Sequence, residues 1–370
     1  MEAWLDLRDR LLISPRFQEW ALAFPLTRPI VRKRQNELFD IVSGFVYSQI
    51  LDAVVQLDVL KHVAGQGRTT TDLARLCALG DDEMRRLAEG AASLRLLQRH
   101  GERYRLGDLG AALFGNAGAL AMIRHHGALY RDITDLPALL RSGRQETNLS
   151  RYWDYARSDD PAAVRAEDVA PYSELMAQSQ RMVAAEVVAS FDFSPYRKLL
   201  DFGGGQGAFV CAVAQAAPSI QLAVFDLPAV AERAKRIFEE HGLSDRATAL
   251  GGSFFGSPPK HAADLVSLVR ILHDHDDDAV ERILKAAFDA VEPGGKLIVC
   301  EPMSTDGGAR RIADAYFNIY LYAMGSGRPR SPEILSKMLK SAGFVSVRRI
   351  KTRSPFVTSV LCADKTANDV

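Results

Sequence analysis

The spacing of hydrophobic residues divides the chain into a helical first part and a second part in which short apolar strands alternate with helices. Apolar side chains recur at helical spacing over residues 37–63 and cover most of that helix's circumference, which favours burial in a subunit interface. From about residue 197 the pattern predicts strands at 198–207, 221–228, 263–272 and 294–302 and helices at 208–218, 229–242 and 277–295. This alternation predicts an α/β fold with a doubly wound parallel sheet.

Residues 69–110 have the pattern of a winged helix-turn-helix. We expect helices at 69–80 and 81–98, the second capped by Asp81 or Asp82, and a β-wing that turns at Gly101. Residues 61–110 carry nine basic and seven acidic side chains, so the net charge of +2 makes a poor surface for phosphates. The module is therefore predicted to be structural, and no nucleic-acid partner is expected.

Composition agrees with an ordinary globular protein. Lys plus Arg equals Asp plus Glu at 46 each, which disfavours a nucleic acid as the main partner. No apolar run reaches 18 residues, and the acidic start does not resemble a signal peptide. The four cysteines are far apart, so they are predicted to be thiols in a reducing compartment rather than a disulfide framework or a zinc site. The expected location is the cytoplasm.

Residues 1–35 form an extension in which aromatic residues precede a basic stretch. Trp4, Trp20 and Phe24 are followed by Arg32, Lys33 and Arg34. One interpretation is a peripheral contact with an anionic membrane surface. The other, which we favour, is a helix packed on the body of the protein or on a partner subunit.

A glycine turn after the first strand of the second part indicates a cofactor site. Gly203 and Gly205 follow Asp201, and Asp226 ends the next strand. The glycines nominally fit the dinucleotide fingerprint, with Asp226 on a ribose, and the turn could also be purely structural. Asp201 decides between the cofactors, because a carboxylate at the mouth of the strand repels a pyrophosphate and attracts the ammonium and sulfonium of S-adenosylmethionine.

Over residues 40–365 the chain resembles class I methyltransferases of the plant caffeate and hydroxyindole O-methyltransferase type. The resemblance rests on LLDFGGGQG, VFDLP, ILHDHDDD, VEPGGKLIVCEP and GRPRSPEILSKMLKSAGF. It implies a Rossmann-like methyltransferase domain at 166–370, a helical winged-helix dimerisation and substrate domain at 36–165, and a homodimer. The opening segment, FDIVSGFVYSQ and NIYLYAMGSGRPRS are most similar to bacterial enzymes that O-methylate the 1-hydroxyl of acyclic carotenoids.

The segment 273–278, HDHDDD, follows a predicted strand and can be interpreted in three ways. Asp276–Asp278 have the composition of a helix cap, with Asp278 and Glu281 at capping-box spacing. His273 and His275 with an aspartate could ligate a metal, but no third ligand cluster is visible, so no metal is expected. The resemblance implies that His273 is the general base that removes the hydroxyl proton.

The resemblance also implies supporting residues. Glu301 matches a carboxylate that orients the base, while Pro329 stands where the family has a second one, so the base is expected to be less supported and proximity more important. Ser253 and Phe254 are expected at the adenine and Arg270 beside the cofactor. Met176, Asn318, Tyr320 and Met324 are expected to line the acceptor site.

Together these observations predict an S-adenosylmethionine-dependent O-methyltransferase acting on an apolar small molecule, with a hydroxylated acyclic carotenoid favoured. A polyketide, indole or tetrapyrrole acceptor, and a winged-helix regulator that binds the cofactor as a sensor, remain the alternatives.

Overall fold

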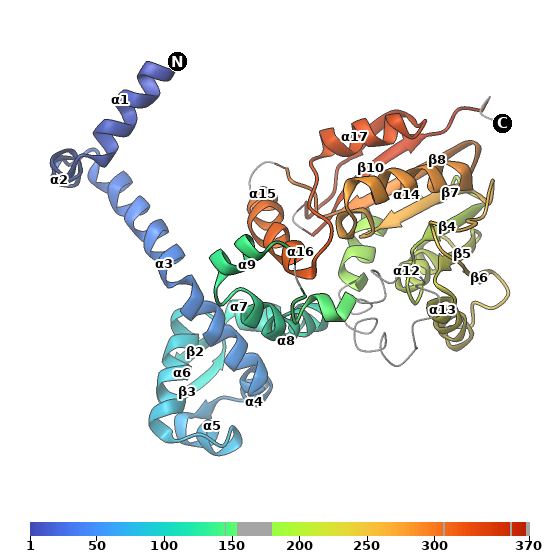
Figure 1. Cartoon of the computed structure of the whole chain (residues 1–370). Helices are drawn as coiled ribbons and strands as arrows, with labels where there is room; N and C mark the ends of the chain where they lie inside the picture. The colour runs from blue at the N-terminus through green and yellow to red at the C-terminus, as the bar shows by residue number, and fades with distance from the viewer. Residues whose placement is uncertain (145, 154–179, 306–307, 356, 368–370) are drawn as a thin grey trace. The chain divides into compact units, whose positions relative to one another are not determined.

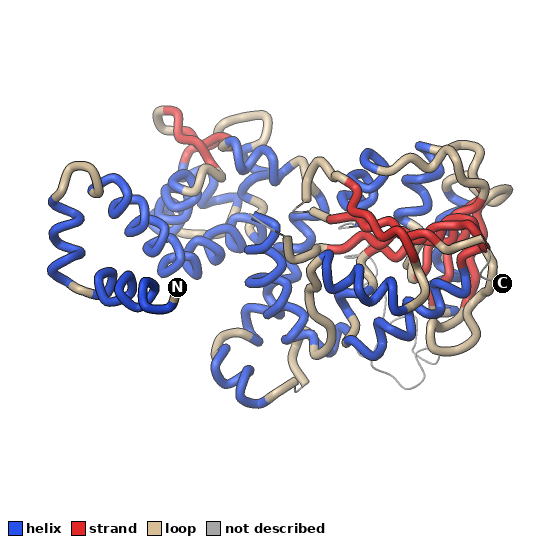
Figure 2. The backbone as a smooth tube through the Cα atoms, turned by 90° about the horizontal axis from the view of Figure 1, so that it is seen from above, coloured by secondary structure: helices blue, strands red, loops and turns tan. Residues whose placement is uncertain are grey.

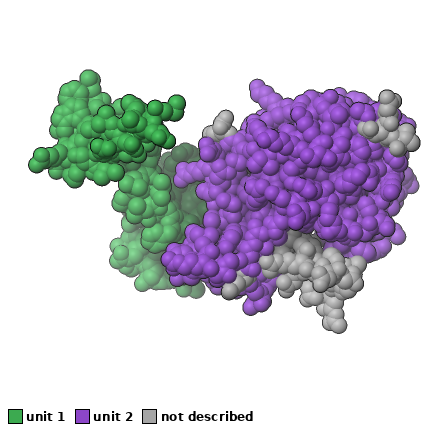
Figure 3. Space-filling view, turned by 45° about the horizontal axis from the view of Figure 1, so that its top comes forward, with its two compact units in different colours: residues 1–115 green, residues 116–370 purple. Residues whose placement is uncertain are grey.

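The computed structural model describes residues 1–144, 146–153, 180–305, 308–355 and 357–367. The chain divides into two compact units, residues 1–115 and 116–370, which are coloured separately in Figure 3. The domain boundary expected at residue 165 lies outside the described residues. The boundary expected at residue 35 falls inside a continuous helix.

The first unit contains the predicted winged helix (Figure 1). Its elements are α1 (Glu2–Ile13), α2 (Pro15–Ala23), α3 (Arg28–Gln56), α4 (Val59–Val63), β1 (Arg68–Thr69), α5 (Thr70–Leu76), α6 (Asp81–Ser93), β2 (Leu97–His100), β3 (Arg103–Leu106) and α7 (Asp108–Phe114). The wing is antiparallel in the order β1-β3-β2 and turns at Gly101, where φ is 59°. The predicted cap of α6 is wrong: Gly80 is the cap residue, and Asp81 and Asp82 lie in the first turn, where their charge favours the helix N-terminus.

Helices α1 to α3 expose an unusual number of large apolar side chains. Helix α1 buries no residue, and α2 buries only Ala21. Helix α3 is long and apolar enough to cross a membrane by length and composition alone, although no run of 18 apolar residues occurs in it. Only 17% of its most apolar window is buried, so this surface needs a covering partner.

The second unit is the α/β domain. Its elements are α8 (Ala117–Asp132), α9 (Leu136–Ser142), η1 (Ser150–Trp153), β4 (Lys198–Phe202), α12 (Ala208–Ala216), β5 (Gln221–Asp226), α13 (Pro228–Glu240), β6 (Ala247–Gly251), β7 (Ala263–Val269), η3 (Leu272–Asp274), α14 (Asp277–Ala290), β8 (Val291–Glu301), α15 (Gly308–Arg311), the π-helix η4 (Ile312–Phe317), α16 (Asn318–Met324), α17 (Pro332–Ser341), β9 (Val345–Ile350) and β10 (Ser359–Asp364).

The sheet of this unit is mixed rather than wholly parallel, which corrects the prediction. The strand order is β6-β5-β4-β7-β8-β10-β9; the first five strands are parallel, and β10 runs antiparallel to both of its neighbours. Strand β10 follows β9 without an intervening helix, so the chain reverses direction instead of crossing over. Helices cover the two faces of the sheet (Figure 2), where two clusters of buried apolar side chains form the core.

The parallel strands end together at one edge of the sheet. The glycine turn follows β4, Asp226 ends β5, His273 follows β7 and Glu301 ends β8. Ligands of open α/β folds bind at this edge, at the carboxyl ends of the strands.

Candidate active site

The turn after β4 requires its glycines. Gly203, Gly205 and Gly207 have φ values of 80°, 58° and 82°, in the left-handed region that favours glycine. A Cβ at Gly203 would lie 2.6 Å from the Ile271 side chain, and one at Gly207 would lie 2.5 Å from Phe238. The turn is therefore packed closely against Ile271, which follows β7, and against Phe238 of α13, with Gly203 and Gly205 half-buried.

Asp201 lies beneath this turn rather than open at the mouth of the strand. Its carboxyl group is 1% exposed, and Oδ1 accepts a hydrogen bond of 2.7 Å from the Ser267 hydroxyl. Oδ2 is buried and has no hydrogen-bond partner among the described residues, and a Cβ at Gly204 would lie 2.6 Å from it. Burial raises the pKa of Asp201 to about 7, although the Ser267 hydrogen bond lowers it. An unpartnered carboxylate oxygen under the turn fits a cationic ligand.

Asp226 holds the glycine turn directly. Its carboxylate accepts hydrogen bonds from the backbone N–H of Gly205, at 2.8 Å, and of Leu227, at 2.7 Å. Burial raises the pKa of Asp226 to about 6 against these hydrogen bonds. A carboxylate oxygen can accept a second hydrogen bond, so Asp226 can still receive ribose hydroxyls while it orders the turn.

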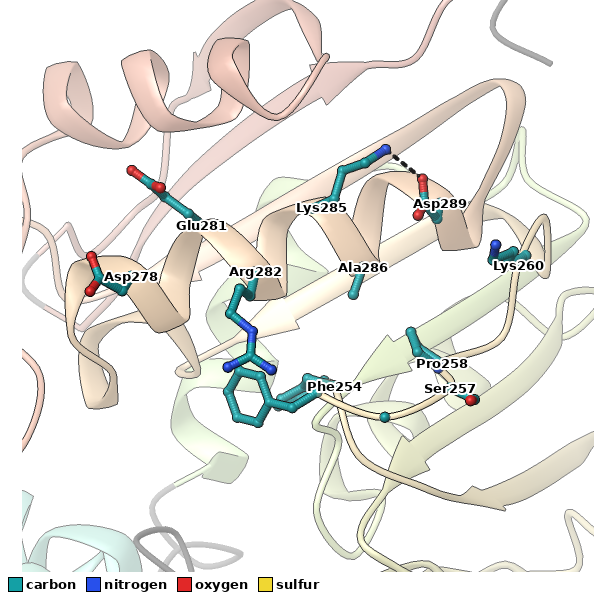
Figure 4. Close-up of a pocket in the computed structure, with 12 residues that line it drawn as sticks. Phe254, Ser257, Pro258, Lys260, Asp278, Glu281, Arg282, Lys285, Ala286 and Asp289 are labelled. Carbon is teal, nitrogen blue, oxygen red and sulfur yellow. Dashed lines mark hydrogen bonds and ion pairs between the residues drawn. The ribbon is translucent and has the colours of Figure 1, made fainter. Parts of the chain in front are cut away.

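Ser253 and Phe254 lie beside the same turn. The Phe254 ring packs against Phe202 in a tilted arrangement, with centroids 5.0 Å apart, and a Cβ at Gly203 would lie 2.9 Å from the Phe254 ring. Ser253 Oγ accepts a hydrogen bond of 3.3 Å from Phe255 N. Phe254 also lines a groove of about 660 Å³ between this loop and α14 (Figure 4). In this groove the Arg282 guanidinium lies over the Phe255 ring. The place of Phe254 beside the turn suits the predicted contact with adenine.

His273 is a buried imidazole held by Glu301. The His273 ring is 4% exposed, and its Nδ1 contacts Glu301 Oε2. Glu301 Oε1 accepts hydrogen bonds from the backbone N–H of Ile271, at 2.9 Å, and of Leu272, at 2.7 Å. One carboxylate therefore orients both the imidazole and the turn that carries it, as expected for an orienting residue.

The other ring nitrogen of His273 faces a second carboxylate. Nε2 lies 3.1 Å from Asp274 Oδ1. Burial lowers the pKa of His273, but Asp274 and Glu301 outweigh it and the pKa is raised. Burial raises the pKa of Asp274 to about 6. Asp274 thus places a second carboxylate against the imidazole, while Pro329 supplies none at the position of the other family carboxylate.

The aspartates after the base do not cap α14 through their side chains. Asp276 is the cap residue by position, but its carboxylate accepts from Arg144, at 2.6 Å, and from the Gly327 backbone, at 3.1 Å. Asp277 pairs with Arg328 and Arg330, whose hydrogen bonds and positive charges lower the pKa of Asp277 to about 2 although burial raises it. These carboxylates instead join the turn to residues 326–330.

Arg270 begins the catalytic turn in the left-handed region, with φ at 58°. Its positive charge lowers the pKa values of His273, Asp274, Tyr316 and Tyr320. The guanidinium thus acts on the base and on the aromatic residues beside it, so Arg270 belongs at least as much to the catalytic centre as to the predicted cofactor site.

Two histidines that sequence reasoning missed pair with tyrosines near the base. His125 Nε2 lies 2.8 Å from the Tyr320 hydroxyl, and His126 Nε2 lies 2.6 Å from the Tyr316 hydroxyl. Burial lowers the pKa of His125 to about 4, so the imidazole is neutral. Phe317 joins this cluster to the base, with its ring centroid 6.0 Å from that of His273. Two consecutive histidines in a largely apolar helix were a weak signal in the sequence.

Of the other residues predicted to line the acceptor site, one is exposed, one is in the core and one lies outside the described residues. Asn318 is exposed at the start of α16, and Met324 is 1% exposed in a core cluster with Leu129 and Leu321. Met176 lies outside the described residues. The π-helix η4, a feature common at functional sites, places Tyr316 and Phe317 beside the base.

A glycine-turn cofactor site joined to a carboxylate-held histidine is the arrangement of a methyl-transferring enzyme. Residues 135–345 match the O-methyltransferase domain, and residues 39–116 match the O-methyltransferase dimerisation domain. The chain therefore belongs to the O-methyltransferase family and is an S-adenosylmethionine-dependent O-methyltransferase. Its dimerisation domain indicates a homodimer.

Curated relatives extend over nearly the whole chain. Demethylspheroidene O-methyltransferase of Cereibacter sphaeroides is 42% identical over 96% of this chain and 93% of its own length. The enzyme of the same name from Rhodobacter capsulatus is 40% identical over 96% and 88%. Acetylserotonin O-methyltransferase of Mus musculus is 29% identical over 86% of both chains.

Solved structures share the fold. Mitomycin 7-O-methyltransferase superimposes with a TM-score of 0.74 at 23% identity and covers 92% of this chain and 100% of its own. Human N-acetylserotonin methyltransferase, solved in complex with S-adenosylmethionine, has a TM-score of 0.73 at 24% identity and covers 90% and 98%.

Proposed function

We propose that this enzyme methylates the 1-hydroxyl of an acyclic carotenoid such as demethylspheroidene or hydroxyneurosporene. The observation that carries the proposal is the identity of 42% over 96% of the chain to a demethylspheroidene O-methyltransferase. Identity falls to 29% over 86% for relatives named for an indole acceptor. The acceptor is thus a long hydrocarbon with one tertiary hydroxyl. The aromatic rings of Phe317, next to His273, and of Tyr316, next to Phe317, suit such a molecule.

His273 takes the hydroxyl proton at Nε2, Glu301 holds Nδ1–H, and Asp274 stabilises the imidazolium that forms. An alkyl alcohol is a much weaker acid than a phenol, so its methylation needs a stronger base. Two carboxylates against one imidazole meet that need, because they raise the pKa of His273. S-adenosylmethionine supplies the electrophilic methyl group.

An acceptor comparison tests the function. Purified enzyme would receive radiolabelled S-adenosylmethionine with detergent-solubilised demethylspheroidene, N-acetylserotonin or a polyketide phenol. We expect kcat/KM for the carotenoid to exceed the others by at least about a hundredfold. Equal or greater turnover of the indole or the phenol would overturn the acceptor assignment.

We also propose that the enzyme is cytoplasmic and meets its acceptor at the membrane through residues 1–35. Trp4, Ile13 and Trp20 are 66%, 74% and 53% exposed, and Arg32, Lys33 and Arg34 are exposed as well. The dimerisation match begins at residue 39, so the partner subunit is expected to cover the exposed residues of α3 from Phe39 onward, which leaves the extension for anionic lipid.

Vesicle binding tests this contact. We expect flotation with phosphatidylserine vesicles but not with phosphatidylcholine alone, and loss of flotation after Arg32→Glu, Lys33→Glu and Arg34→Glu together, at about 1 kcal/mol per charge removed. The triple variant should keep its activity on acceptor in detergent. Two results together would contradict the proposal: the enzyme becomes monomeric when residues 1–35 are removed, and the triple variant binds vesicles as the wild type does. They would mean that a second copy of the chain covers this surface instead.

A further inference from the structure

The turn that carries His273 is held by residues 326–330 as well as by Glu301. Ser326 Oγ donates to the Asp274 carbonyl at 2.8 Å. Arg330 donates from Nη1 to the Leu272 carbonyl and from Nη2 to the His275 carbonyl, both at 2.8 Å. The base therefore stands between two carbonyl groups that a single guanidinium binds.

Arg330 is a buried charge with its donors engaged. Its side chain is 1% exposed, and it pairs with Asp277 through Nε at 2.9 Å and Nη2 at 2.6 Å. A buried cation is costly unless its hydrogen-bonding groups are satisfied. Arginine spreads its donors over three nitrogens in a planar fork, which here reaches one carboxylate and two carbonyls, whereas a lysine carries its donors on a single nitrogen and does not reproduce this geometry.

The backbone approaches closely at the same place. Gly327 has φ at 80°, and a Cβ there would overlap the His273 carbonyl oxygen. The segment 326–330 is thus packed directly against the catalytic turn. Pro329 occupies the position of the second family carboxylate, and the residue next to it reaches the turn's backbone instead.

We propose that Arg330 is a positioning residue that holds the Leu272–His275 turn, and with it His273, against Glu301 and Asp274. It acts on the backbone on both sides of the base and not on the reacting atoms. Without it the turn loosens, and the imidazole of His273 is no longer held in place against Glu301. The proposal rests on the assignment of His273 as the base.

Arg328 provides a matched control. It pairs with the same Asp277 carboxylate at 2.7 Å, but its side chain is 45% exposed, and in the described structure it donates to no carbonyl of the turn. Arg328→Lys and Arg330→Lys therefore make the same chemical change on the same carboxylate. Only Arg330→Lys removes the hydrogen bonds to the carbonyls of Leu272 and His275.

The experiment compares these two variants in the full-length enzyme. For Arg330→Lys we expect kcat to fall at least about tenfold, with the KM for the acceptor and the affinity for S-adenosylhomocysteine within about threefold of wild type. The His273 ring, assigned in NMR spectra by comparison with His273→Gln, should titrate closer to an ordinary histidine. Arg328→Lys should match wild type in every measurement.

A purely structural role gives a different result. If Arg330→Lys lowers only the melting temperature, with kcat and the His273 titration unchanged, the proposal is wrong. If Arg330→Lys does not fold, Arg330→Gln takes its place, because it also removes the guanidinium that binds the two carbonyls; an unchanged His273 titration there also overturns the proposal. The NMR titration needs no acceptor, so an error in the acceptor assignment would appear separately, as failure of the wild-type enzyme to methylate a carotenoid alcohol.

Discussion

Replacing Glu301 with Gln should test the catalytic base with almost no change in shape. Glu301 Oε1 receives two backbone N–H groups, and Oε2 receives His273 Nδ1–H. A buried donor left without a partner costs about 1–3 kcal/mol, so the single oxygen of Gln should stay with the two N–H groups. The amide NH2 then faces Nδ1 and stabilises the opposite imidazole tautomer, with the proton on Nε2.

The expected loss is large because Nε2 can no longer accept a proton. General base catalysis contributes about 10²–10⁴ in rate, and a carboxylate-to-amide exchange behind a catalytic imidazole costs about 10⁴ in kcat. We therefore expect kcat to fall by about 10³–10⁴. Loss of the carboxylate also lowers the pKa of His273, so any residual activity should rise with pH at a lower pH than in wild type.

The assay is transfer of a radiolabelled methyl group under saturating conditions, from pH 5.5 to 9. In wild type, kcat should rise with pH through a pKa above that of an ordinary histidine, because the base acts only when unprotonated. Binding of S-adenosylhomocysteine by calorimetry controls for the fold and should be unchanged in Glu301→Gln. A loss of less than about threefold in kcat would refute the base assignment and leave proximity between the reacting groups as the main source of catalysis.

Three further predictions follow from the buried ionisable groups. Asp201 has a pKa of about 7 in the free enzyme and must ionise to receive an ammonium group. The affinity for S-adenosylhomocysteine, measured by calorimetry, should therefore fall as the pH drops below 7. Asp201→Asn should bind S-adenosylhomocysteine weakly, with an affinity that depends less on pH. The pKa of His125 is about 4 in the folded protein and about 6.5 in the unfolded chain, so the unfolded chain binds a proton at higher pH than the folded protein does. The free energy of unfolding measured in urea should therefore fall as the pH drops from 6.5 to 4, and it should fall less in His125→Phe. Tyr320→Phe removes only the hydroxyl that meets His125 and should raise the KM for the acceptor several-fold without changing cofactor affinity; an unchanged KM would mean that the pair only packs α8 against α16.

Local patterns were sufficient for much of the fold and part of the site. A strand that ends in a glycine turn and opens a helix is specified by neighbouring residues, because positive φ values and strand alternation act over a few positions. The winged helix, the glycine turn after β4 and the place of His273 after β7 were predicted in this way. The antiparallel strand β10 was not, because its direction depends on how the chain returns to the sheet between β8 and β9.

The sequence by itself thus determined the family, the cofactor class and the identity of the candidate base, since each depends on short motifs with fixed spacing. Only the tertiary structure decided how that base is supported. Arg330 meets the Leu272 carbonyl across 58 positions of the chain, and His125 meets Tyr320 across 195. Such contacts leave no local signal, because they arise only when packing of the apolar core brings distant segments to the same edge of the sheet.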